Sequence, residues 1–163
     1  MDSAVDRVLV AHPSGPMEVP ADVLMRFVAP MWGFTQREFA LLPASRQGIW
    51  WLISTGDQPV TFVLADPFVA AADYAIDVNE SEQEALGLED LNDALALVLL
   101  VMPSRPGDPV TGNFRAPLVF NLRERKVLQV VNRDERYHLA SPVDLSAYPL
   151  PSPPVDESTP SSD

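Results

Sequence analysis

The stretch Ile49-Trp50-Trp51-Leu52-Ile53 decides the fold class, because it is apolar on both faces of an extended chain. Successive side chains of a strand point to opposite faces, so a strand without polar positions is buried on both sides. The run from Leu95 to Met102 has the same character. Trp50 and Trp51 cannot both face one core, and we expect opposite layers to cover them. The alternative is that one of them is exposed as an anchor for a partner.

Short extended segments surround these two runs, and proline and glycine separate them at short intervals. Their β-branched and aromatic residues are typical of strands. Gln129 lies between apolar neighbours in Val127–Val131, as in a half-exposed strand. We predict a mostly β fold, a small closed or nearly closed antiparallel β-barrel, because closure removes exposed strand edges. The expected strands are Arg7–Ala11, Val23–Val28, Phe39–Leu42, Ile49–Ser54, Val60–Ala65, Tyr74–Val78, Leu95–Met102, Leu118–Asn121 and Val127–Val131.

Helix is confined to one or two short segments. Ser81-Glu82-Gln83-Glu84 has the pattern of a capping box, in which the serine and the glutamate three residues later satisfy each other's free amides. Gly87 ends this helix, since glycine readily adopts the left-handed conformation found at helix ends. The acidic stretch 89–93 predicts a further turn before the second apolar strand.

The chain divides into one barrel domain, residues 1–148, and a tail, residues 149–163. The tail contains five prolines and several serines, and its charged residues are acidic. Only Leu150 and Val155 are large apolar residues there. Such a segment buries too little surface to offset its ordering entropy, so we predict that it is disordered.

Several classes of protein are excluded by composition. The chain has no cysteine, which excludes a disulfide framework, a thiolate zinc site and a cysteine nucleophile. The first residues carry acids where a secretion signal needs bases. The longest apolar stretch, from Ala94 to Met102, has nine residues, about half of what a membrane helix requires. We therefore expect a cytoplasmic protein that does not contact the membrane.

The net charge of −12, from 23 acids and 11 bases, predicts which partners the chain can bind. A field of this sign repels phosphates, so we expect no direct contact with nucleic acid. It suits a basic protein partner, although acidity that only keeps the protein soluble is the simpler interpretation. Residues 73–93 hold eight acids and no base, and form either a solvated surface or a docking surface. These acids are Asp73, Asp77, Glu80, Glu82, Glu84, Glu89, Asp90 and Asp93.

Signs of catalysis are scarce. The two histidines, His12 and His138, lie far apart in sequence, and no familiar metal, nucleotide or nucleophile motif occurs. We expect no catalytic residue, no metal and no cofactor. Asp66 ends an apolar strand, where a catalytic carboxylate could lie, but Asp followed by Pro is more typical of a turn. Two alternatives remain: a small β-barrel enzyme or metabolite-binding protein that uses Asp66 and His138, and a structural barrel without a regulatory role.

Phe62–Phe68 and Asp73–Ile76 form an apolar strand, an Asp-Pro-Phe turn and an acidic-aromatic segment, in that order. This order resembles the FliW family of flagellar assembly factors. The most specific similarity is Asn113-Phe114-Arg115-Ala116-Pro117-Leu118-Val119-Phe120-Asn121, followed at the family's spacing by Gln129-Val130-Val131. The resemblance extends from about Val8 to Pro142 in the family's order. Residues 12–28 and the segment after Tyr137 depart from the family pattern.

The resemblance implies a non-enzymatic adaptor that is monomeric when free and acts as a chaperone and translation regulator in flagellum biogenesis. FliW proteins bind newly made flagellin; when flagellin is scarce they bind the RNA-binding repressor CsrA and relieve its block on flagellin translation. The exposed acids and the central motif are the candidate contacts. The alternative is that Asn113, Pro117 and Asn121 have purely structural roles and shape the turn between two strands. The candidate partner-binding residues are Asp73, Tyr74, Asp77, Glu80, Glu82, Glu84, Asn113, Pro117 and Asn121.

Overall fold

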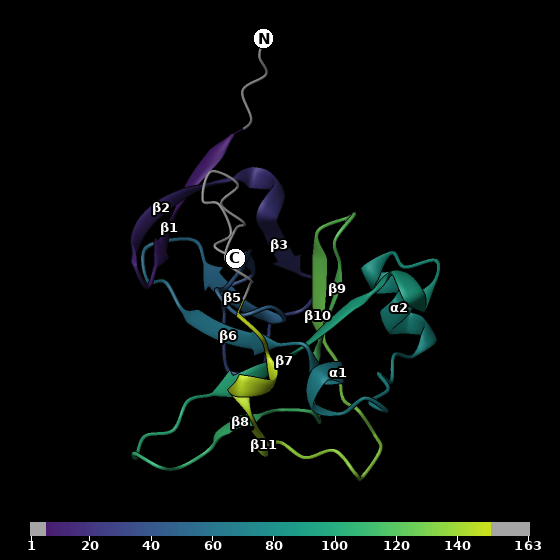
Figure 1. The fold of residues 1–163 in the computed structure, drawn as a ribbon. Coiled ribbons are helices and arrows are strands. Elements are labelled where there is room, and N and C mark those ends of the chain that lie inside the picture. Colours follow the sequence, from purple (N-terminus) through teal and green to yellow (C-terminus); the bar gives the residue numbers. More distant parts are fainter. Residues whose placement is uncertain (1–5, 151–163) are drawn as a thin grey trace, which may run out of the picture.

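The computed structural model describes residues 6–150, and these form a closed β-barrel (Figure 1). The strands pair in the order β7-β6-β5-β4-β3-β10-β9, and pairing of β9 with β7 closes the ring. Closure confirms the predicted barrel. The sheet is mixed and not purely antiparallel, because β10 runs parallel to β3. The barrel strands are β3 (Leu24–Phe27), β4 (Glu38–Pro43), β5 (Ile49–Ser54), β6 (Thr61–Ala65), β7 (Leu95–Val101), β9 (Leu118–Asn121) and β10 (Lys126–Gln129).

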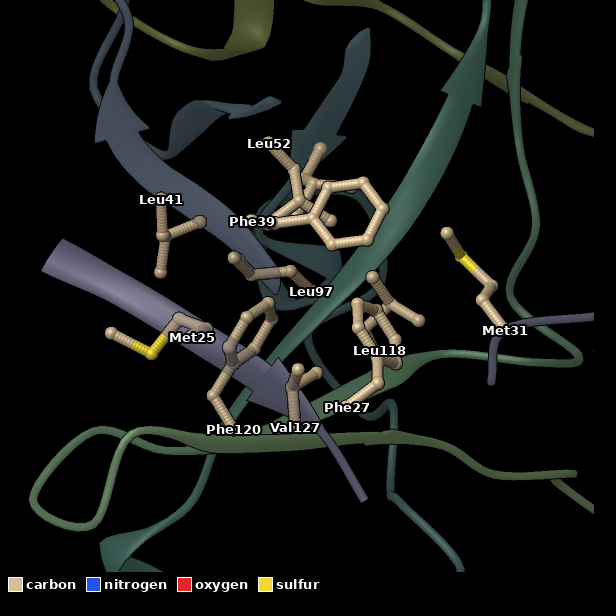
Figure 2. Close-up of a cluster of buried hydrophobic side chains, with 11 residues drawn as sticks. Met25, Phe27, Met31, Phe39, Leu41, Leu52, Leu97, Leu118, Phe120 and Val127 are labelled. Atoms are coloured by element: carbon tan, nitrogen blue, oxygen red, sulfur yellow. The ribbon is translucent and has the colours of Figure 1, made fainter. Parts of the chain in front are cut away.

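Alternate side chains of these strands fill the barrel interior (Figure 2). Phe39, Leu52 and Phe120 meet there from three different strands, and none of them is accessible to solvent. Trp50 packs against this inner cluster and Trp51 against a cluster on the outside, so opposite layers cover the two, as predicted. The buried members of the inner cluster are Met25, Phe27, Met31, Phe39, Leu41, Leu52, Leu64, Leu97, Leu118, Phe120 and Val127.

A β-hairpin outside the barrel covers part of its wall. It comprises β1 (Arg7–His12) and β2 (Gly15–Pro20), and a short 3-10 helix, η1 (Ala21–Val23), leads from it into β3. Val10 and Val19 of the hairpin are buried against Ala40 and Ile53 of the barrel. β1 was predicted but β2 was not, because its two prolines and its glycine resemble a loop.

The C-terminal part of the described chain packs beside β7, outside the closed ring of strands. β8 (Val110–Gly112) pairs with β7 and with β11 (Ser141–Val143), and η3 (Leu145–Ala147) follows. Tyr148 is fully buried, and its hydroxyl donates to the carbonyl oxygen of Asp66 at 2.6 Å. Burial raises the pKa of Tyr148 to about 12. The expected barrel domain ends at this residue; its boundary stays a prediction, because most of the expected tail, residues 151–163, lies outside the described residues.

Two short α-helices lie on the outer wall: α1 (Pro67–Ala70), and α2 (Glu80–Leu86), which precedes the 3-10 turn η2 (Leu91–Asp93). The capping box of α2 starts at Asn79 and not at Ser81. The Asn79 side chain accepts from the Glu82 amide at 2.8 Å, and Glu82 accepts from the Asn79 amide at 2.9 Å. Gly87 ends α2 at a φ of 71°, as predicted.

The predicted strand Tyr74–Val78 is wrong. The backbone hydrogen bonds of this segment are made within a turn and with a side chain, and not with a neighbouring strand. The Tyr74 amide donates to the Ala71 carbonyl at 2.9 Å, and the Asn132 side chain donates to the Ala75 carbonyl at 2.6 Å. This irregular segment connects α1 to α2 along the outside of the barrel.

Candidate protein-docking surface

Helix α2 and the turn η2 present a group of free carboxylates. The helix is fixed by Leu86 and Leu88, which are buried against Val119 and Val130 on the outer wall of β9 and β10. Its acids therefore face solvent, apart from Glu82, whose carboxylate serves the helix cap. Within residues 6–150, the remaining carboxylates of this region form no ion pair, and only that of Asp90 has a hydrogen bond, accepting from the Asn92 amide at 2.9 Å as the cap of η2. We call these residues the acidic surface: Glu80, Glu84, Glu89, Asp90 and Asp93.

Two acids at the start of the same segment are paired by arginines from a distant part of the chain. Arg133 binds both carboxylate oxygens of Asp77, at 2.9 and 2.8 Å. These hydrogen bonds lower the pKa of Asp77 from 3.8 to about 2. Arg136 binds Asp134 at 2.8 Å and lies 3.4 Å from Asp73. Asp73 and Asp77 are thus partly neutralised, which concentrates the unpaired negative charge on the acidic surface.

An apolar groove adjoins the acidic surface. It has a volume of about 400 Å³. Leu91 and Asn92 of η2 form one wall, next in sequence to Asp90 and Asp93 of that surface. Asp93 itself lines a different pocket, together with Leu122 and Arg123. Phe68 of α1 lies on the other side with 44% of its side chain exposed, and its neighbour Val69 is 42% exposed. The lining residues are Phe68, Tyr74, Ala75, Ile76, Leu91, Asn92, Ala94 and Ala96.

Tyr74 forms the floor of this groove. Only 3% of it is exposed, and its ring meets Phe68, Phe114 and Tyr137 edge to face, with centroids 4.6–5.8 Å apart. Its hydroxyl donates to the Phe114 carbonyl at 2.7 Å. Burial raises the pKa of Tyr74 from 10.0 to about 12. The groove is therefore lined by uncharged side chains and has a tightly packed aromatic floor.

The three candidates of the central motif serve the fold. The Asn113 side chain accepts from the Ala116 amide at 3.0 Å, and the buried Pro117 accepts from the Val130 amide at 3.0 Å. Asn121, only 2% exposed, donates to the Leu86 carbonyl at 2.8 Å and ties α2 to the barrel. Each holds a turn or a packing contact, and a contact of these three residues with a partner stays a prediction.

The residues proposed for an enzyme have structural contacts of their own. The Asp66 carboxylate caps α1 by accepting from the Phe68 amide at 2.9 Å, and Pro67 is the first residue of that helix. This is the turn role expected from sequence. His138 is exposed, and its backbone carbonyl accepts from Phe114 and Arg115. In the described part of the chain, no hydrogen bond joins the Asp66 and His138 side chains, and no cluster of three potential metal ligands occurs. None of the helices between residues 6 and 150 is long and apolar enough to cross a membrane.

Sequence analysis missed the apolar groove. Phe68, Leu91 and Ala94 come from three separate elements, and nothing in the linear order brings them together. One signal was present: Phe68 and Val69 are adjacent apolar residues in a short segment after Asp66-Pro67, where one short helix cannot bury both.

The fold and this surface define a class of protein: a small, closed mixed β-barrel with a short acidic helix and an apolar groove on its outer wall. The family model described as "FliW protein" matches residues 9–143 of the chain. The chain therefore belongs to the FliW family, as the motifs in its sequence predicted.

Individual relatives agree. The chain is similar to the "Flagellar assembly factor FliW" of Symbiobacterium thermophilum, with 33% identity over 80% of this chain and 96% of that protein. That of Pseudothermotoga lettingae is 32% identical over 76% of this chain and 80% of that protein. A solved structure, "Crystal structure of the flagellar assembly factor FliW", matches with a TM-score of 0.73 and 26% identity, covering 84% of this chain and 96% of that one.

Proposed function

We propose that this chain is a non-enzymatic, cytoplasmic adaptor of flagellum assembly that binds flagellin, a CsrA-type translational regulator, or both in turn. Membership of a family of flagellar assembly factors supports the process. The observation that carries the binding site is the apolar groove of about 400 Å³, whose wall at η2 lies between Asp90 and Asp93 in the sequence. The proposed contacts are the acidic surface and the groove.

The groove suits an amphipathic helix of the partner. Such a helix places apolar side chains at every third or fourth position into an apolar groove and its polar face outside. Basic residues at the edge of that helix would face Asp90 and Asp93, at the two ends of η2. The groove therefore provides apolar contact area, while the acids select a basic partner and orient it.

Charge explains how one surface can relieve repression by an RNA-binding protein. A net charge of −12 attracts a basic protein over long range and speeds its association. Once bound, the same charge repels the phosphates of RNA. If flagellin occupies the same groove, it displaces the regulator by direct competition, and free flagellin sets the level of its own translation.

Replacing Phe68 with Ser tests this groove. We expect about tenfold weaker binding to purified flagellin, to the CsrA-type regulator, or to both, because an exposed aromatic anchor is lost. Leu139→Ser is the matched control, since Leu139 is 64% exposed and lies outside the groove lining. Isothermal titration calorimetry measures both variants. Equal affinities for wild type and Phe68→Ser with both partners would contradict the proposed site.

A further inference from the structure

The hairpin outside the barrel has one open edge. In antiparallel pairs, residues that exchange hydrogen bonds alternate with residues whose N–H and C=O groups point away from the partner strand. The Ala21 amide donates to the Asp6 carbonyl at 2.8 Å, in register with the pairing of Val8 with Val19. The hydrogen-bonded residues of β1 are therefore the even-numbered ones, and Leu9 and Ala11 direct their backbone groups away from β2. Within residues 6–150, these groups have no backbone partner.

The other edge of the hairpin is closed. By the same register, Pro16, Glu18 and Pro20 of β2 point away from β1. Proline has no amide hydrogen, so two of these three positions cannot donate to another strand. Prolines on an edge are a common protection against unwanted strand pairing. β1 lacks that protection, and no further strand among residues 6–150 pairs with its edge.

A groove runs along the open edge. Its volume is about 290 Å³. The hairpin forms one wall, with Leu9, Val10, Ala11 and Pro16, and the end of β5 and the loop to β6 form the other, with Ser54, Gly56, Asp57 and Pro59. Leu9 is 66% exposed at its border. Asp57 lines the opposite wall, and its carboxylate forms no ion pair within the described part of the chain. The groove thus offers free backbone groups, apolar contact and one unpaired negative charge.

We propose that the open edge of β1 binds an extended segment of a partner protein, in which apolar and basic residues alternate, as an added strand. Backbone hydrogen bonds to Leu9 and Ala11 would supply the pairing, and a basic side chain would face Asp57. Two other occupants fit less well. Residues 151–163 of this chain contain four prolines, which interrupt strand pairing, and a second copy brings another net charge of −12.

This site is separate from the one under Proposed function. Figure 1 shows β1 and β2 on one side of the barrel and α2 on the other. With both sites, this chain binds a helical segment of a partner beside α2 and an extended segment at β1 at the same time.

Proline substitution on each edge tests the proposal with a matched pair. Leu9→Pro removes a donor from the open edge, whereas Glu18→Pro removes the one donor that points outward from the same hairpin's other edge. The probe is an acetylated, amidated peptide of alternating lysine and valine, six residues long, titrated into the full chain. Its acidic counterpart, with glutamate for lysine, tests the charge. Two-dimensional NMR follows the backbone amides, and circular dichroism confirms the fold of each variant.

We expect the lysine–valine peptide to shift the Leu9 and Ala11 amides and to slow their exchange with solvent. Leu9→Pro should weaken this binding by about tenfold, and Glu18→Pro should leave it unchanged. If circular dichroism shows that the Leu9→Pro variant does not form the hairpin, a modified peptide replaces the variant in the test. This peptide is N-methylated at alternate amides, and it should fail to bind the wild-type chain. Shifts confined to other amides, equal binding of the acidic peptide, or a dimer of this chain formed through β1 would overturn the proposal.

Discussion

Helix α2 packs on the outside of the barrel wall, against strand β9 of the central motif. The side chains of the strand are buried, whereas most of those of the helix are exposed. Every residue of Leu118–Asn121 is buried. In Glu80–Leu86, Leu86 alone is buried, and Glu80 and Glu84 are exposed. The strand carries the family's most specific motif, and its contacts hold the fold. The surface that we propose for a partner lies on the helix beside it, whose pattern is far less specific.

The largest effect should come from the buried strand. Phe120→Ala removes a ring from the barrel interior, where Phe120 is 0% exposed. We expect a loss of about 3–5 kcal/mol in the free energy of unfolding, because the cavity cannot fully collapse. Leu122→Ala, two residues later and 46% exposed, is the control and should change stability by less than about 0.5 kcal/mol. Urea denaturation measures both; similar losses would show that the strand is not the core of the fold.

We expect a medium loss of stability from a change at Asn121, where strand β9 is hydrogen-bonded to helix α2. Asn121→Asp replaces the amide that donates to the Leu86 carbonyl with a carboxylate, leaving a buried acceptor opposite another acceptor. We expect about 1–3 kcal/mol of destabilisation. Asn92→Asp makes the same change at an exposed position and should cost far less. Equal midpoint temperatures of thermal unfolding for the two variants would mean that Asn121 does not tie α2 to the barrel.

The smallest effect should come from an ion pair beside the helix. The pKa of Asp77 is about 2 in the folded chain and near 3.8 when unperturbed. Because the folded pKa is the lower one, the stabilisation is complete above pH 3.8 and is lost as the pH falls towards 2. Asp77→Asn should cost about 0.2–1 kcal/mol at neutral pH, since Arg133 is 71% exposed.

The difference in unfolding free energy between wild type and Asp77→Asn should shrink as the pH falls from about 5 to about 2.5. Asp108→Asn, at an exposed position, is the control and should give no such dependence. A difference that stays constant over this range would show that the pair with Arg133 does not lower the Asp77 pKa.

Strands with a strong apolar pattern could be predicted from sequence, and those decided by distant contacts could not. Ile49–Ser54 and Leu118–Asn121 are observed with the expected bounds. Tyr74–Val78 has the alternation of a strand, but Asn132, more than fifty residues later, takes its backbone bonds. β2 is the opposite case: its prolines resemble a loop, yet they point away from β1 and leave the pairing intact.

The candidate site was predictable only in its charge. The density of acids in residues 73–93 correctly indicated an exposed acidic segment. Arg133 and Arg136 pair with Asp77 and Asp73 across more than fifty residues, so sequence could not show which acids stay free. The cap at Asn79 was also not predicted, and it gives the carboxylate of the candidate Glu82 a role at the helix end.

Association kinetics with a purified CsrA-type regulator test the central claim, that the acidic surface guides a basic partner. The test variant reverses Glu84, Glu89 and Asp93 to Lys; the control reverses three exposed acids away from α2 and η2, Glu18, Asp22 and Asp108, with the same change in net charge. Charges at the border of an interface act mainly on the association rate, and salt screens them beyond about 8 Å at physiological ionic strength.

Stopped-flow mixing at low and at physiological salt gives the association rate and its salt dependence. We expect the test variant to associate about tenfold more slowly than the control variant at low salt, with a flatter salt dependence and a nearly unchanged dissociation rate. Equal association rates and salt dependence for the two variants would contradict the claim and leave the acidic surface as solvated surface only.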